Sequence, residues 1–276
     1  MINPHARLPW SPLAMGRSLW HHRELIARMA RRDVAARYRG TVGGLLWAVI
    51  TPIVMLAVYT FVFSVVFQAK WGTLEQSRTQ FALILYAGLL MHGLLAEVLN
   101  GAPGLIPAHG NYVKKVVFPL EVLPVVSLCT ALFQWCIGLV VLLVACALLN
   151  GGIPATAPLI VLVVVPLLLM VLALGWLASA LGVYLRDLGQ VMVVITTILL
   201  FMSPVFFPLT AIPQEYRLFM QANPLTFIIE QGRAVLIWGQ APDWAGLLAY
   251  TGVALVLAWL GFAGFQATRK GFADVL

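Results

Sequence analysis

Charged residues are scarce in this sequence. Asp, Glu, Lys and Arg make up only 10% of the 276 residues, whereas soluble domains carry about 25%. Hydrophobic residues account for 62%. One core of this size cannot hide so much apolar surface from water, so the composition excludes an ordinary soluble domain. It predicts a protein whose solvent is largely lipid.

The sequence motifs of common catalytic and metal sites are also missing. No lysine follows a glycine, which excludes a P-loop, and neither G-x-S-x-G nor H-E-x-x-H occurs. The five histidines show no metal-ligand spacing, and the three cysteines fall in one apolar run, where we interpret them as small buried hydrophobes. We therefore expect no catalytic site, cofactor or metal on this chain. Energised transport would need a partner.

Apolar runs long enough to cross a bilayer occur six times. A span needs about 20 apolar residues, and these runs are continuous rather than alternating, which favours helices over a barrel. The runs cover residues 44–68, 81–99, 122–149, 157–185, 191–209 and 244–266. The sequence therefore predicts an all-α integral membrane protein. Six spans within residues 44–266 would lie between an N-terminal segment, 1–43, and a tail, 267–276.

Lysine and arginine are distributed unevenly along the chain. Eight of the 17 lie in the first 39 residues, and alternate loops of the six-span arrangement hold 13 against 4. Because cytoplasmic loops collect Lys and Arg, we expect both termini in the cytoplasm. The net charge of +7 then reflects contact with anionic membrane lipids, and no nucleic-acid partner is expected.

Three segments outside the runs carry further patterns. Residues 19–39 alternate apolar side chains with arginines and contain no proline or glycine, which favours an amphipathic helix in the membrane interface over a simple topogenic anchor. Residues 101–119 suit either a short helix on the cytoplasmic surface or a plain loop. Residues 210–243 are apolar and broken by prolines, which favours two short re-entrant helices.

Aromatic side chains follow one face of two predicted spans. Tyr59, Phe63 and Phe67 are four residues apart in the first span, and Phe201 and Phe206 lie near the outer end of the fifth. Such faces can stack on sugar rings without holding them in fixed hydrogen bonds, which suits a moving polymer. The alternative is helix packing together with interfacial aromatic belts.

Four segments, in this order, resemble one known family. They are the stretch Arg31–Gly40 with Gly44–Ala48 and Thr51-Pro52, the connection Asn111–Pro124, the run Ser203–Pro208, and Asn223–Thr226. Together they resemble the permeases of type 2 ABC exporters, within the branch that exports O-antigen, capsule or teichoic acid. Leu120 stands where that branch commonly has a basic residue. The likeness covers about residues 20–270.

The resemblance implies partners and roles. It implies a homodimer in the bacterial inner membrane, a separate nucleotide-binding ATPase subunit that holds ATP and Mg²⁺, and a polysaccharide on an undecaprenyl-pyrophosphate-like carrier. The implied sites are a pathway at Tyr59, Phe63, Phe67, Phe201 and Phe206, head-group contacts at Arg37 and Arg39, ATPase coupling at Leu105, Asn111, Tyr112, Lys114 and Lys115, and an outer gate at Pro208, Pro224, Glu230 and Arg233. Glu230 and Arg233 are three residues apart and are expected to pair within a gate helix.

Two other functions remain open at this point. A related permease could export a drug or another small lipophile, which would need a narrower and more apolar path. An integral-membrane transferase acting on lipid-linked sugars would need paired carboxylates or a His/Asp pair as general base. Glu215, Glu230 and Asp243 lie in the last outer segment, but their spacing does not form such a pair.

Overall fold

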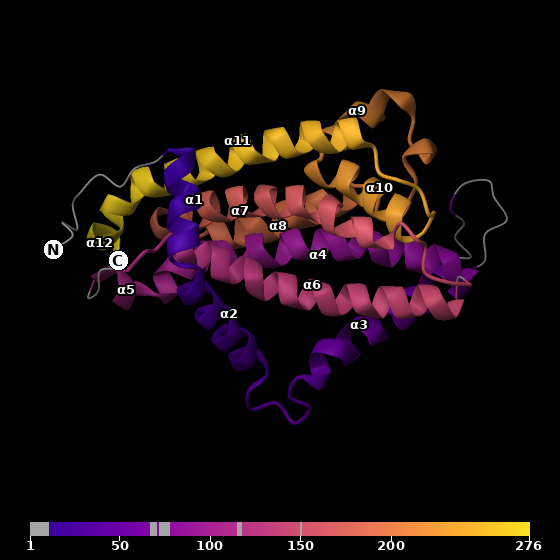
Figure 1. The fold of residues 1–276 in the computed structure, drawn as a ribbon, viewed down its shortest axis with the longest axis horizontal. Coiled ribbons are helices and arrows are strands. Elements are labelled where there is room, and N and C mark those ends of the chain that lie inside the picture. The colour runs from indigo at the N-terminus through magenta and orange to yellow at the C-terminus, as the bar shows by residue number, and fades with distance from the viewer. Residues whose placement is uncertain (1–10, 67–70, 72–77, 115–117, 150) are drawn as a thin grey trace.

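The protein is a bundle of long helices (Figure 1). The computed structural model describes residues 11–66, 71, 78–114, 118–149 and 151–276, and every regular element in that part of the chain is helical. The long helices are α3 (Leu46–Tyr59, continued by the π-helix η1, Thr60–Val66), α4 (Arg78–Ala108), α6 (Val122–Leu149), α7 (Ile160–Tyr184, after the 3₁₀ turn η2, Ala157–Leu159) and α11 (Trp244–Thr268). The prediction of an all-α fold is confirmed.

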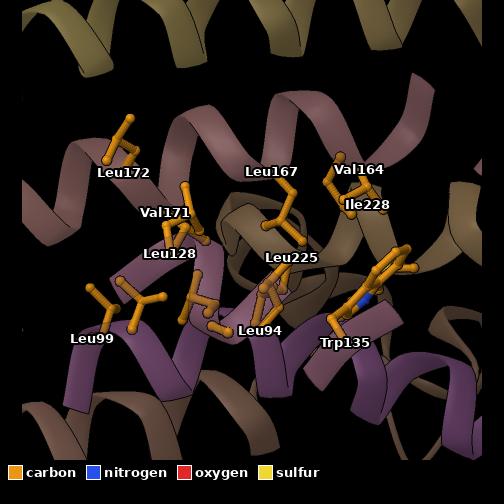
Figure 2. Close-up of a cluster of buried hydrophobic side chains, with 14 of the residues drawn as sticks. Leu94, Leu99, Leu128, Trp135, Val164, Leu167, Val171, Leu172, Leu225 and Ile228 are labelled. Carbon is orange, nitrogen blue, oxygen red and sulfur yellow. The ribbon is translucent and has the colours of Figure 1, made fainter. Parts of the chain in front are cut away.

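Helix α4 lies at the centre of the bundle. It packs against α6, α7, the shorter helix α8 (Leu188–Phe201) and α10 (Pro224–Leu236). Figure 2 shows leucine, valine and isoleucine side chains from α4, α6, α7 and α10 meeting there. The share of each span buried inside the protein is 67% for α4 but only 17% for α3. Helix α3 is therefore left for contact with lipid or another chain.

Glycines allow two pairs of spans to approach closely. A Cβ atom at Gly182 would lie 2.2 Å from the Pro103 carbonyl oxygen on α4, and one at Gly261 would lie 2.5 Å from the Ala173 oxygen on α7. Lipid is as apolar as leucine, so close packing through small residues is a main source of helix association in membranes. These glycines set the α4–α7 and α7–α11 contacts.

Within the described ranges, five helices are long and apolar enough to cross a membrane. The expected fifth span, residues 191–209, is wrong as a continuous helix because α8 ends at Phe201. Its 14 residues rise about 21 Å, against a hydrocarbon core of about 30 Å. Pro204 and Pro208 follow, and each lacks the backbone N–H that would hydrogen-bond the preceding turn of a longer helix.

The connection after α4 also differs from expectation. Residues 101–119 were expected to form either a short surface helix or a plain loop, but α4 continues through Pro103 and Pro107 to Ala108. The short helix expected in this region exists as α5 (Gly110–Lys114). Gly101 and Gly104 face open space and do not pack against another helix. The contacts that hold this last part of α4 in the bundle are made by its buried apolar residues, among them Ala102 and Ile106.

The N-terminal segment forms two helices where one was predicted. Helix α1 (Pro12–His21) is capped by Ser11, whose hydroxyl accepts the Ala14 N–H, and α2 (Arg23–Tyr38) follows after His22. Ile26 and Met29 are the buried side chains of α2, which packs on α6. Figure 1 shows α1 crossing α11 at a steep angle to the spans, the orientation expected of a helix lying in the interface.

The last outer segment folds back onto the bundle. The 3₁₀ turn η3 (Leu209–Ala211) leads to α9 (Gln214–Ala222) and α10, and α10 packs against α4 and α7. The two predicted short helices are therefore present. The expected C-terminal tail is also packed: η4 (Arg269–Gly271) and α12 (Phe272–Val275) follow α11, and Phe272 is fully buried against Phe265 and Tyr184.

Candidate functional site

Phenylalanine rings from four segments form a continuous row at one end of the bundle. Phe206 stacks on Phe201 at 5.5 Å between ring centroids and on Phe63 at 5.9 Å, and Phe63 stacks on Phe81 at 6.0 Å. The structure thus brings together three of the predicted pathway residues, which lie on η1, on α8 and after α8. Phe81 extends the row and was not predicted.

The end of α8 explains why Phe206 reaches back to Phe201. Helical hydrogen bonding stops at Met202, the Ser203 hydroxyl bonds to the Leu200 carbonyl, and Pro204 prevents a further turn. The chain turns at this point, so the Phe206 ring lies over the helix it has just left. Phe201 itself is 60% exposed, and an aromatic surface therefore stays open beside the row.

Tyr59 lies one helical turn before Phe63 and faces a cavity instead of the row. It lines a cavity of about 220 Å³ between α3, α4 and α6, together with Tyr86, Glu97 and Gln134. The indole N–H of Trp135, also on this cavity, finds no acceptor among the described residues. The cavity therefore offers hydrogen-bonding groups beside aromatic rings. Phe67, the fifth predicted pathway residue, lies outside the described residues.

Arg233 holds the outer segment against the spans. Its side chain is fully buried on α10, yet every nitrogen has a partner. It donates to the carbonyls of Ile84 on α4 and of Pro204 and Val205 after α8, and it pairs with Glu230 at 3.2 Å. The predicted pairing of Glu230 with Arg233 is confirmed, and three further contacts accompany it.

A buried guanidinium needs such complete bonding, because an unpaired charge in an apolar site is very costly. Burial lowers the pKa of Arg233 to about 10, so the group stays charged at neutral pH. Gly88 makes room for it, since a Cβ there would lie 2.8 Å from Nη2. The site therefore links α10 to α4 and to the broken end of α8.

Asn223 makes the second link between the outer segment and α8. Its side-chain oxygen caps α10 by accepting the Leu225 N–H, while its Nδ2 donates to the Leu199 and Met202 carbonyls at 3.0 and 2.9 Å. Pro224 is the first residue of α10, and Pro208 precedes η3. Asn223 was not among the predicted gate residues, although Asn before Pro is a recognisable helix-start signal.

Beside the Tyr59 cavity, Arg37 on α2 forms an ion pair with Glu97 on α4. The neighbouring Tyr38 hydroxyl donates to Gln134 on α6, whose amide donates to the Ala48 carbonyl on α3. Within the described part of the chain, Arg39 makes no ion pair. Of the two arginines predicted to meet a head group, Arg37 thus has a protein partner and Arg39 is free.

A buried cluster around Glu121 joins the N-terminal helices to the C-terminal end. The Glu121 carboxylate accepts from Arg269 at 2.8 Å and from the Ser18 hydroxyl on α1 at 3.0 Å. The Trp176 indole donates to the Glu121 backbone carbonyl, and Arg269 also donates to that of Phe118. Sequence spacing could not reveal this pair, because 148 residues separate its members.

The predicted coupling residues lie around α5. Tyr112 stacks between His109 and Phe118, and it lies close enough to Arg32 of α2 to raise, together with Asp33, the pKa of that guanidinium. Asn111 is exposed and Leu105 is partly buried. Lys114 ends α5, but its side chain lies outside the described residues, as does the whole of Lys115. The described members of the set connect α5 with α2.

Known proteins resemble this chain along almost its whole length. The family described as ABC-2 type transporter matches residues 24–237. An O-antigen export system permease protein, RfbA, of Myxococcus xanthus is 29% identical over 94% of this chain and 97% of its own length. An RfbA of Klebsiella pneumoniae is 22% identical over 96% and 99%. The polysialic acid transport protein KpsM of Escherichia coli is 23% identical over 87% and 91%.

The family match covers well over half of the chain. The matched region runs from the start of α2 to the end of α10 and so contains the phenylalanine row, the Arg233 site and the Arg37–Glu97 pair. This chain belongs to the ABC-2 type transporter family.

Proposed function

We propose that this chain is the permease subunit of an ATP-driven exporter of a lipid-linked, O-antigen-like polysaccharide. The observation that carries the proposal is the row formed by Phe81, Phe63, Phe206 and Phe201. The C–H faces of sugars are attracted to the negative faces of aromatic rings. Phe201 is exposed and Phe63 and Phe206 are partly buried, so a glycan can contact these three rings in turn as it advances, without breaking a specific set of hydrogen bonds. The buried Phe81 supports the row from behind.

The exposed faces of α3 and α8 support a homodimer. Both helices leave large apolar side chains uncovered, among them Ile53, Met55 and Val58 on the first and Val194, Ile198 and Phe201 on the second. Two copies that meet along these faces would enclose a pathway with a phenylalanine row on each side. A closed two-fold arrangement is the commonest form of homo-oligomer.

The cytoplasmic end would hold the ATPase subunit, which binds ATP and Mg²⁺ in this proposal. Helices α1, α5 and α12 lie at the same end of the bundle (Figure 1), which supports cytoplasmic placement of both termini in the bacterial inner membrane. Tyr112 of α5 lies beside Arg32 of α2, and the Arg37–Glu97 pair joins α2 to α4. Movement of α5 by the ATPase would thereby reach the spans.

The carrier head group would meet the free cation of Arg39, because a pyrophosphate forms strong charge-assisted contacts with arginine. At the opposite end, the Arg233 and Asn223 links would hold the outer segment as a gate over the row. A ligand shifts an equilibrium only by its differential affinity for two states. Glycan binding alone therefore cannot drive export in one direction, and an ATP-driven rearrangement is required.

The test is surface polysaccharide measured by gel in a deletion strain complemented with wild type, Phe63→Ala or Phe61→Ala. Phe61 is the matched control, because it lies on the same π-helix and is 59% exposed without a place in the row. We expect the deletion and Phe63→Ala to lose surface polymer and to accumulate lipid-linked polymer inside, at normal protein levels. Phe61→Ala should restore export.

If the deletion leaves surface polysaccharide unchanged, the polysaccharide assignment fails. Export of a small lipophile by the same family then becomes the leading function. If both phenylalanine variants restore export, the chain still exports polysaccharide but the row is a packing feature.

A further inference from the structure

A second cavity lies between α1 and α11, away from the row and from the Arg233 site. It has a volume of about 270 Å³ and is lined by Ala14, Arg17, Ser18, His21 and His22 of the N-terminal segment and by Glu121, Phe262 and Gln266. Phe262 provides an apolar floor, and the polar residues surround it. Neither the phenylalanine row nor the coupling contacts use this cavity.

Two groups on the cavity lack partners within the described part of the chain. The side-chain oxygen of Gln266 is buried and has no hydrogen-bond donor. A buried acceptor without a donor is unfavourable, so the oxygen is suited to a ligand that brings a donor. The Arg17 guanidinium, on the opposite wall, makes no ion pair or hydrogen bond with any described residue and is suited to an anion.

The surroundings place this cavity at a membrane surface. On α1, Leu13 and Trp20 flank Arg17 at the spacing of one helix face and are 82% and 72% exposed. Leucine and tryptophan beside a cation are typical of helices that lie in the bilayer interface. On α11, Leu248 and Leu255 are 74% and 48% exposed, and their seven-residue spacing from Phe262 places them on the helix face that carries it, as an apolar stripe that leads away from the cavity along the span. Acyl chains can lie on that stripe while a head group occupies the cavity.

We propose that this cavity binds the head group of a phospholipid that carries both a phosphate and a cationic hydrogen-bond donor, namely phosphatidylethanolamine. Arg17 binds the phosphate, with the imidazoles of His21 and His22 beside it. The ammonium group donates to the Gln266 oxygen and lies near the buried Glu121 carboxylate. Phosphatidylcholine has the same phosphate but no donor, so it satisfies only the first half of the site.

The experiment is a lipid titration of the purified full chain by native mass spectrometry, with phosphatidylethanolamine and phosphatidylcholine as probes. Wild type should bind phosphatidylethanolamine about tenfold more tightly than phosphatidylcholine. Arg17→Ala should weaken both about tenfold. Gln266→Met should weaken only phosphatidylethanolamine, down to the level of phosphatidylcholine. Arg31→Ala, which removes another exposed arginine without an ion pair, should match wild type.

Equal binding of the two lipids by wild type would overturn the proposal, as would an equal loss in Arg17→Ala and Arg31→Ala. Phosphatidylglycerol and undecaprenyl phosphate separate other sources of a phosphate. Phosphatidylglycerol has hydroxyl donors but no positive charge, so tighter binding of it than of phosphatidylethanolamine would show that the ammonium group does not set the preference. If undecaprenyl phosphate displaces phosphatidylethanolamine most strongly, the cavity serves the exported lipid. Either result contradicts the assignment, and neither bears on whether the chain exports polysaccharide.

Folding of the variants is checked by their melting temperatures in detergent without added lipid. Arg17 is exposed and unpaired among the described residues, so its replacement should leave the melting temperature unchanged. The wild-type comparison of the two lipids and the Arg17 variant decide the outcome even if Gln266→Met proves less stable.

Discussion

The guanidinium of Arg233 lies over the indole ring of Trp71, with its central carbon 4.3 Å from the ring centroid. This is well within the distance of a cation–π contact, which is strongest when water is excluded. The same guanidinium bonds three backbone carbonyls and one carboxylate. A single side chain thus joins the segment between α3 and α4 to α10, α4 and the end of α8.

Arg233→Lys should lower the free energy of unfolding by about 2–4 kcal/mol. Lysine keeps the charge but lacks the planar fork, and it would leave buried carbonyls without donors at about 1–3 kcal/mol each. Thermal unfolding in detergent measures the loss. Arg217→Lys on α9 is the control, because Arg217 bonds only nearby carbonyls at the surface. An equal effect of the two changes would contradict this account.

Gly88→Ala should destabilise the protein through the same site. The new Cβ would lie 2.8 Å from Arg233 Nη2 and 3.4 Å from the Val205 Cα, so either the side chain or the backbone must move. Gly93→Ala on the same helix meets nothing within 4 Å and should be neutral or stabilising by up to about 1 kcal/mol. If the clash is with Arg233, Gly88→Ala should add little destabilisation to an Arg233→Ala background.

Glu121→Ala should cost about 3–5 kcal/mol, because it leaves the largely buried Arg269 without its counter-charge. Removing both partners should cost less than the sum of the single changes, with a coupling of about 1–3 kcal/mol. Denaturant unfolding of the two single variants and the double variant measures the coupling. Glu24→Ala, which breaks the exposed pair with Arg28, should change stability by less than about 1 kcal/mol. Strict additivity at Glu121 and Arg269 would disprove the pairing.

Exchange of the charges at Arg37 and Glu97 distinguishes two roles for Arg37. Arg37→Glu places two carboxylates together and should reduce export, while the double exchange Arg37→Glu/Glu97→Arg should restore most of it. Surface polysaccharide per unit of expressed protein is the measurement. A double variant as defective as the single one would show that Arg37 acts on a group other than Glu97, such as the carrier head group.

Prediction of the fold succeeded where hydrophobic length was the deciding signal. Helix α6 has the predicted bounds of residues 122–149, and the fourth span differs by a single residue. It failed where the effect of a proline on a helix depends on the neighbouring helices. Pro103 is accommodated within α4, beside the close approach of Gly182, whereas Pro204 follows the end of α8. Composition alone does not distinguish the two cases, because neighbouring helices decide whether the freed backbone groups are satisfied.

Prediction of the site shows the same division. Helical spacing placed Phe63, Phe201 and Phe206 on predicted faces, but it could not show that Phe206 turns back between the other two rings. It paired Glu230 with Arg233 because they are one turn apart. It missed Trp71, Asn223 and the Glu121–Arg269 pair, whose partners are distant in the chain.

The sequence by itself determined that the protein is largely surrounded by lipid, that its fold is all-α, and which family it belongs to. Apolar runs must have their backbone bonds satisfied internally in lipid, and that requirement follows from composition and length alone. Only the tertiary structure decided where α8 ends, which aromatic rings stack and why a charge can be buried at Arg233. Those features depend on close contacts between distant segments, which local periodicity does not encode.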